Sequence, residues 1–246
     1  MRMASLRWML PAIAVTVALL AGCTPTAPTA PPDHALTTEE AQRLAIARFT
    51  NYDEGVREIV AEVPGEQPVR FTGWVDFANH RGLVSVGRSK DAPGELGLYA
   101  WTGDSIAVRD GAVPAAELPL PEGDWQIEQL DPSSSVVQNL FAVALSLGSD
   151  RPDNPTLLQQ SDARWLRSDT IDGTPVDVIT GPTSDGPATS TPDPAAATVR
   201  YWIDDKGRLL RVELRQPGGD NWTRLDLGAK SDVDLTPVQT LVAGVG

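Results

Sequence analysis

The sequence has little of the chemistry that disulfides and metal centres require. Its 246 residues include one cysteine and two histidines. One cysteine cannot close a disulfide within the chain, and a cysteine-based zinc site needs several sulfur ligands. Of the histidines, only His80 lies in the region expected to fold. No metal site and no cofactor are therefore expected.

Positive charge is also scarce. The chain has 20 basic and 33 acidic residues, for a net charge of −13. This balance disfavours nucleic acid as a partner, because phosphates attract a basic surface. Apolar residues make up 41% and charged residues 22%, which is typical of a globular chain. The 21 glycines and 21 prolines indicate many turns, as in a β-rich fold.

No apolar run is long enough to span a bilayer comfortably. The longest candidate, residues 8–20, has 13 residues, whereas a spanning helix needs about 20. Arg2 and Arg7 begin this segment with positive charge, and small residues followed by Cys23 end it. Such an order is typical of an export signal.

Cys23 stands at the position where a lipid anchor would be attached. The tetrapeptide Leu20-Ala21-Gly22-Cys23 resembles a bacterial lipobox. That resemblance implies removal of residues 1–22, a diacylglycerol on the Cys23 sulfur, and anchoring by its acyl chains, palmitate among them, on the extracytoplasmic side of the cell membrane. The alternative is an ordinary signal peptide followed by a chance cysteine. A free exported thiol would be a chemical liability, which favours the lipidated form.

A proline-rich tether follows the cysteine. Residues 24–33 contain four prolines, which remove backbone donors and favour extended conformations. We assign residues 23–35 to the lipidated cysteine and tether, and residues 36–246 to a single α+β domain.

The first half of this domain is expected to be a helix followed by hairpins. Thr37 and Glu40 have the spacing of a capping box before a run with helical periodicity. Residues 56–63 are ambiguous between helix and strand, and the turn at Pro64-Gly65 that closes them favours a strand. The period then becomes two, which favours antiparallel hairpins over residues 71–77, 83–88, 96–101 and 105–109.

Residues 132–147 return to helical character, with Ser133 or Ser134 as the expected cap. A short helix is expected to begin at Asn154-Pro155. The remaining predicted strands are residues 165–171, 176–180, 198–203, 209–215 and 222–227. The segment 181–197, rich in Pro, Ser, Thr and Ala, is expected to be a long loop.

Catalytic motifs are missing. No Gly-x-Ser-x-Gly nucleophile motif occurs, and His80 at a hairpin turn has the position of a solvated turn residue. The segment Asp204-Asp205-Lys206-Gly207 has part of a calcium loop but neither its ligand spacing nor its closing glutamate. We expect no catalytic residues and no enzyme activity.

Tryptophan is the conspicuous remaining signal. Six tryptophans lie in or beside predicted strands: Trp74, Trp101, Trp125, Trp165, Trp202 and Trp222. They could fill a core, since tryptophan buries a large apolar area, or they could line an open face for an apolar ligand. Trp74 and Trp202 share their strand faces with polar neighbours, so the six need not all point into one core.

The order of these elements resembles a known group of envelope proteins. The stretches Trp165-Leu166-Arg167, Tyr201-Trp202-Ile203-Asp204 and residues 207–213 (Gly-Arg-Leu-Leu-Arg-Val-Glu) carry the resemblance most closely. With the lipobox and tether, the chain resembles actinobacterial envelope lipoproteins of the LolA/LolB-like superfamily, of the LppX and LprG type.

The resemblance implies a strongly curved antiparallel half-barrel wrapped around a few helices. It also implies a non-catalytic lipoprotein that binds or transfers a lipid, glycolipid or lipidated ligand in an apolar cavity between the sheet and helix 132–147. Phe141 and Leu145 would line that cavity, together with Trp74, Trp101 and Trp202. The alternative is a module or sensor with a filled core that docks on another envelope protein, because one fold serves several functions.

Overall fold

A computed structural model describes residues 33–112, 116–183 and 194–243. Cys23, most of the tether and residues 184–193 of the predicted loop lie outside these ranges. Within them, no helix has the length and apolar character needed to cross a membrane.

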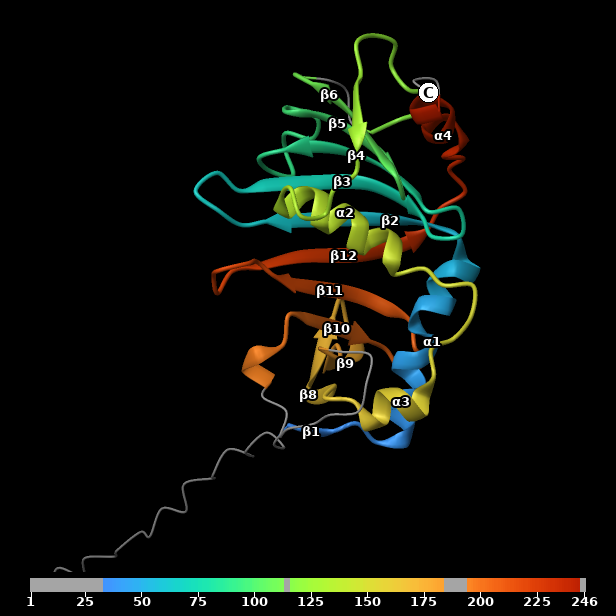
Figure 1. The fold of residues 1–246 in the computed structure, drawn as a ribbon, viewed down its shortest axis with the longest axis vertical. Coiled ribbons are helices and arrows are strands. Elements are labelled where there is room, and N and C mark those ends of the chain that lie inside the picture. Colours follow the sequence, from blue (N-terminus) through green and yellow to red (C-terminus); the bar gives the residue numbers. More distant parts are fainter. Residues whose placement is uncertain (1–32, 113–115, 184–193, 244–246) are drawn as a thin grey trace, which may run out of the picture. The chain divides into compact units, whose positions relative to one another are not determined.

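One antiparallel sheet of twelve strands dominates the described part of the chain (Figure 1). Its spatial order is β1-β8-β9-β10-β11-β12-β2-β3-β4-β5-β6-β7, and the two ends of this order do not pair. The strands are β1 His34–Ala35, β2 Val56–Val63, β3 Val69–Asp76, β4 Arg81–Gly87, β5 Gly97–Thr102, β6 Ser105–Asp110, β7 Gln126–Gln129, β8 Arg164–Ile171, β9 Thr174–Thr180, β10 Val199–Ile203, β11 Leu209–Arg215 and β12 Trp222–Lys230.

The sheet consists of two meanders that meet in its middle. Strands β2 to β7 form one run of neighbours and β8 to β12 the other, and β12 pairs with β2 to join them. The predicted antiparallel hairpins and the α+β class are therefore confirmed at the coarse level, as an open antiparallel sheet with few helices.

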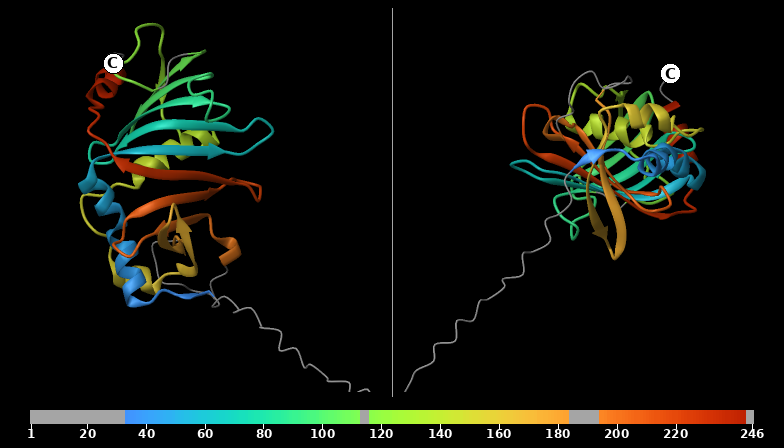
Figure 2. Two further views of the ribbon diagram at one scale, coloured as in Figure 1. Left: turned by 180° about the vertical axis from the view of Figure 1, so that it is seen from behind. Right: turned by 90° about the horizontal axis from the view of Figure 1, so that it is seen from below.

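Four α-helices accompany the sheet: α1 Thr38–Glu54, α2 Val136–Ser146, α3 Pro155–Gln160 and α4 Thr236–Ala243, with a short 3-10 turn at Pro194–Ala196. Side chains of α1, α2 and α3 pack into one core with the sheet face that we call the inner face. Helix α4 packs instead on the opposite, outer face, over β4, β5 and β6 (Figure 2).

Local signals explain where the helices begin. The capping box is confirmed: the Thr37 side chain accepts a hydrogen bond from Glu40 N–H, and Glu40 in return accepts one from Thr37 N–H. The expected cap of α2 was wrong by one or two residues. Ser135 is the N-cap, and Ser133 and Ser134 instead bond to Asp131 in the preceding turn.

Three elements differ from the sequence prediction. His34 and Ala35, assigned to the tether, form β1 and pair with Trp165 and Arg164 of β8. Strand β7 and helix α4 were not predicted, because each is too short to show a clear period. Their apolar residues, such as Ile127 and Val238, pack on the outer face.

A buried arginine ties the centre of the sheet to α1. Arg57 of β2 is fully buried and donates hydrogen bonds to the carbonyls of Leu209, Leu227 and Gly228. Its Nη1 also donates to Asn51 Oδ1 at 2.7 Å. Burial lowers the pKa of Arg57 to about 10, which leaves the group charged at neutral pH. It therefore joins both meanders to the end of α1.

Candidate functional site

Three of the five residues expected to line a cavity fill the inner core instead. Phe141 and Leu145 of α2 are 1% and 5% exposed, and Trp101 of β5 is 0% exposed. The rings of Phe141 and Trp101 stack with centroids 4.2 Å apart and an interplanar angle of 16°. Phe71 and Tyr99 also contact Phe141 with their rings, so the space between α2 and the sheet is packed here.

The other two residues lie on the outer face. Trp74 packs in the cluster beneath α4, while its neighbour Val75 belongs to the inner core. Trp202 is 2% exposed and clusters with Val176 and Val178. Because successive residues of a strand point to opposite faces, Trp74 and Trp202 do not share one space with Trp101. The expectation of one common cavity lined by all five residues is therefore corrected.

Trp202 is also held by a specific polar contact. Its indole Nε1 donates to Asp169 Oδ2 at 2.9 Å. This hydrogen bond, with a second from Thr170 N–H, lowers the pKa of Asp169. The contact gives Trp202 a structural role between β8 and β10.

A cleft of about 300 Å³ opens elsewhere on the inner face, between α1, α3 and strands β10 and β11. Its apolar lining is Leu44, Ala47, Leu157, Leu158, Pro182, Tyr201 and Leu209. Leu44, Ala47 and Leu209 form the buried floor. Leu157 is 51% exposed, the largest value among the exposed large apolar side chains of the described residues.

Tyr201 forms the sheet-side wall of this cleft. It pairs across the strands with Ile179 and Val212, both of the inner core. Burial raises the pKa of its phenol, so the hydroxyl stays neutral at physiological pH. The wall is therefore uncharged and mostly apolar.

One ion pair borders the cleft. Arg48 of α1 lies 3.1 Å from Asp153, and its Nε donates to the carbonyl of Ser146 at the end of α2. The two charges cancel, and the same contacts fix the segment that leads into α3. The Asn154 cap and Pro155 then start α3 and place Leu157 and Leu158 toward the cleft.

This cleft was not predicted from the sequence. The short helix at Asn154-Pro155 was predicted, with Leu157 and Leu158 in it, but nothing local relates α3 to Leu44 or Tyr201. The signal that could have pointed to it is a pair of leucines on a short helix with no predicted partner.

The polar motifs weighed in the sequence have turn roles. His80 is exposed and adopts a φ of 49° in the turn before β4. Asp204 Oδ1 accepts hydrogen bonds from the backbone N–H groups of Lys206 and Arg208, which closes the β10–β11 turn.

Comparisons with known proteins do not assign this chain to a family. No family model matches the chain, and no curated protein matches it. A conserved uncharacterised protein from Thermus thermophilus is similar at a TM-score of 0.41 and 9% identity, covering 78% of this chain and 88% of that one. A putative outer membrane lipoprotein-sorting protein domain from Vibrio parahaemolyticus is similar at a TM-score of 0.29 and 12% identity, covering 84% and 99%.

Proposed function

We propose that this chain is a non-catalytic binding protein whose inner-face cleft holds one apolar chain of a lipid or of a lipidated ligand. The observation that carries the proposal is the half-exposed Leu157 over a floor of buried Leu44, Ala47 and Leu209. Exposed apolar side chains that converge on a concave surface mark binding sites.

The size of the cleft limits the ligand. At about 300 Å³ it stands at the lower end of the range of ligand pockets, about 300–1,000 Å³. Each buried methylene contributes about 0.8 kcal/mol. One acyl chain therefore suits the cleft better than a lipid with several chains. The Arg48–Asp153 pair at the rim has no net charge. It therefore favours neither a positive nor a negative charge at the polar end of the ligand.

Export and lipidation at Cys23 belong to the same proposal. The chain enters the domain through β1, where Asp33 lies 2.7 Å from Arg164 and the His34 ring stacks on Trp165. Figure 1 places β1 at the same end of the sheet as α3, which lines the cleft. A lipid at Cys23 would anchor the domain to the membrane through the segment that precedes β1. This is the role that the likeness to LolA/LolB-like lipoproteins implied.

Photocrosslinking tests the proposal on the full chain in cells. A palmitic acid analogue with a diazirine on its chain is supplied, and crosslinks within residues 33–243 are mapped by mass spectrometry, so that any analogue incorporated at Cys23 is not counted. We expect adducts on α3 and β10, and at least a fivefold loss of labelling in Leu157→Asp. Ile46→Asp is the matched control, because Ile46 is 37% exposed on α1 and does not line the cleft. Equal labelling of both variants would contradict the proposal.

A second function is favoured by a specific observation. The stacked Phe141 and Trp101 fill the space under α2, as in an interaction module with a filled core. Such a protein would dock on another envelope protein. Absence of any crosslink within residues 33–243 of the unchanged chain would support this alternative.

A further inference from the structure

The outer face carries an ordered array of arginines that the proposed cleft does not use. Arg224 of β12 lies 2.9 Å from Glu62 of β2, and Arg70 of β3 pairs with the same carboxylate. Arg200 lies over the Trp222 ring, 3.8 Å from its centroid. Arg200 also faces Glu213 at 3.6 Å. These cross-strand contacts hold the guanidinium groups in place.

A pocket of about 550 Å³ lies at one end of this array. Its walls are the β2–β3 hairpin, the segment after β4 and the start of β12. The charged groups that line it are Arg70, Arg88, Lys90 and Arg224 against Glu62 and Glu213. The pocket thus has an excess of two positive charges in a chain whose net charge is −13.

The pairing around the pocket leaves the charges of Arg88 and Lys90 uncompensated. Glu62 pairs with Arg70 and Arg224, Arg224 also lies 3.0 Å from Asp226, and Glu213 faces Arg200 outside the lining. Arg88 donates to the neutral Gln67 at 3.0 Å. Within the described ranges neither Arg88 nor Lys90 forms an ion pair with a carboxylate, and both are exposed.

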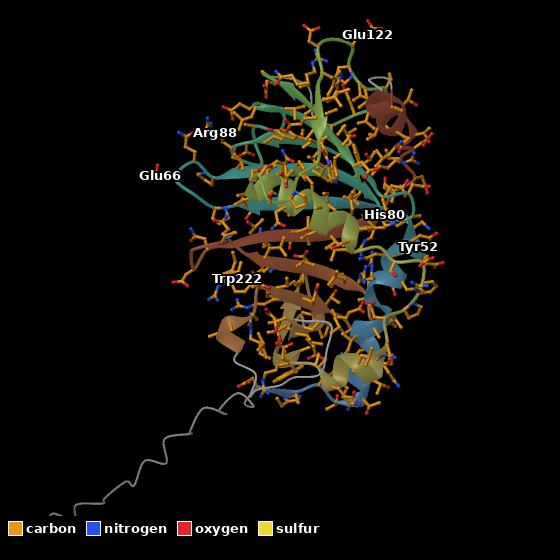
Figure 3. All side chains as sticks on the ribbon, viewed as in Figure 1. Tyr52, Glu66, His80, Arg88, Glu122 and Trp222 are labelled. Atoms are coloured by element: carbon orange, nitrogen blue, oxygen red, sulfur yellow. The ribbon has the colours of Figure 1, made fainter. Side chains whose placement is uncertain are left out.

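The segment that carries these two cations is fixed by the backbone. Leu96 N–H donates to the Val86 carbonyl at 2.9 Å, which closes the segment behind β4. The Ala92 carbonyl approaches Gly87 so closely that a side chain at residue 87 would collide with it. Figure 3 shows Arg88 at the same rim of the sheet as Trp222, with Glu66 at the tip of the β2–β3 hairpin.

We propose that this outer-face pocket binds a ligand through a phosphate group. Guanidinium groups match phosphate oxygens in paired hydrogen bonds, and a lysine adds a mobile point charge. The pocket is larger than the free ion, which suits a phosphate carried on a headgroup. Because it lies on the opposite face from the cleft, this site is independent of the function proposed above.

Calorimetric titration of the full chain in the uncharged detergent dodecyl maltoside tests the site. The probes are inorganic phosphate and glycerophosphoglycerol, the soluble headgroup of phosphatidylglycerol. We expect the double variant Arg88→Gln, Lys90→Gln to weaken binding at least tenfold. The matched control, Arg151→Gln with Lys206→Gln, removes the same charge from exposed positions outside the pocket and should change the affinity less than twofold.

The two probes distinguish the sources of the phosphate. Tighter binding of glycerophosphoglycerol assigns the site to a lipid headgroup, and tighter binding of the ion assigns it to free phosphate. No binding of either probe by the unchanged chain overturns the proposal. So does an equal loss in both double variants, because that result would reflect net charge and not this pocket.

Discussion

Arg57 connects several elements at the centre of the sheet by hydrogen bonds. A buried cation is costly unless its donors are satisfied, and here three backbone carbonyls and Asn51 accept from it. Asn51 in turn donates to the carbonyl of Leu147 at the end of α2. Arg57 and Asn51 together therefore link β2, β11 and β12 to the ends of α1 and α2.

Replacing this residue should destabilise the protein strongly. Arg57→Leu leaves several buried acceptors unpaired at about 1–3 kcal/mol each, so we expect the free energy of unfolding to fall by at least about 3 kcal/mol. Urea denaturation followed by tryptophan fluorescence measures this. The control Arg151→Leu, at an exposed position, should change stability by less than about 0.5 kcal/mol. A similar small change in Arg57→Leu would show that the network is dispensable.

At the scale of elements, the packing of α2 on the sheet depends on a glycine that lies opposite a tryptophan of the neighbouring strand. Gly82 of β4 pairs directly with Trp101 of β5, and the indole occupies the space that a side chain at residue 82 would need. The same indole stacks on Phe141 of α2. A glycine in one strand thus allows a helix to pack on its neighbour.

A methyl group at residue 82 should therefore disturb α2. Gly82→Ala forces Trp101 against Phe141, and overpacking of this kind costs about 1–3 kcal/mol. We expect a lower melting temperature and a changed near-ultraviolet circular dichroism signal. Gly103→Ala is the control, because no atom lies within 4 Å of the added methyl group and the backbone there is not left-handed. Equal effects of the two substitutions would contradict this account of the packing.

At the scale of the whole molecule, the join between the meanders decides the architecture. Strand β12 pairs with β2 although their sequences lie about 170 residues apart, as in the pair Leu227 and Ile59. This pairing makes one continuous sheet, and its inner face receives α1, α2 and α3. The outer face is left to α4 and to the arginine array.

The proposed lipid anchor at Cys23 would attach the whole molecule to the membrane. In a bacterial host that processes lipoproteins, the unchanged chain should incorporate radioactive palmitate and sediment with the membranes. Cys23→Ser should abolish the label, since the chain has no other cysteine. Thr24→Ser, beside it, should keep the label. An unchanged chain that takes up no label would contradict lipidation at Cys23.

Much of the local structure could be predicted from the sequence. The capping box at Thr37, the short helix after Asn154 and the alternation of β3 and β11 depend on neighbours within four residues. Alternation along a strand also predicts which neighbours share a face with each tryptophan. It does not predict which strand faces pack into the same core. That is why Trp74 and Trp202 were grouped with Trp101, although the structure separates them.

The sequence by itself determined the acidic charge, most elements and the antiparallel hairpins, because all of these depend on composition or on short-range periodicity. Only the tertiary structure decided the β12–β2 pairing, the filled core under α2, the cleft and the outer-face pocket. The cleft joins Leu44 to Leu209, and the pocket joins Glu62 to Arg224. Contacts over such separations depend on how whole elements pack, and no local pattern records that.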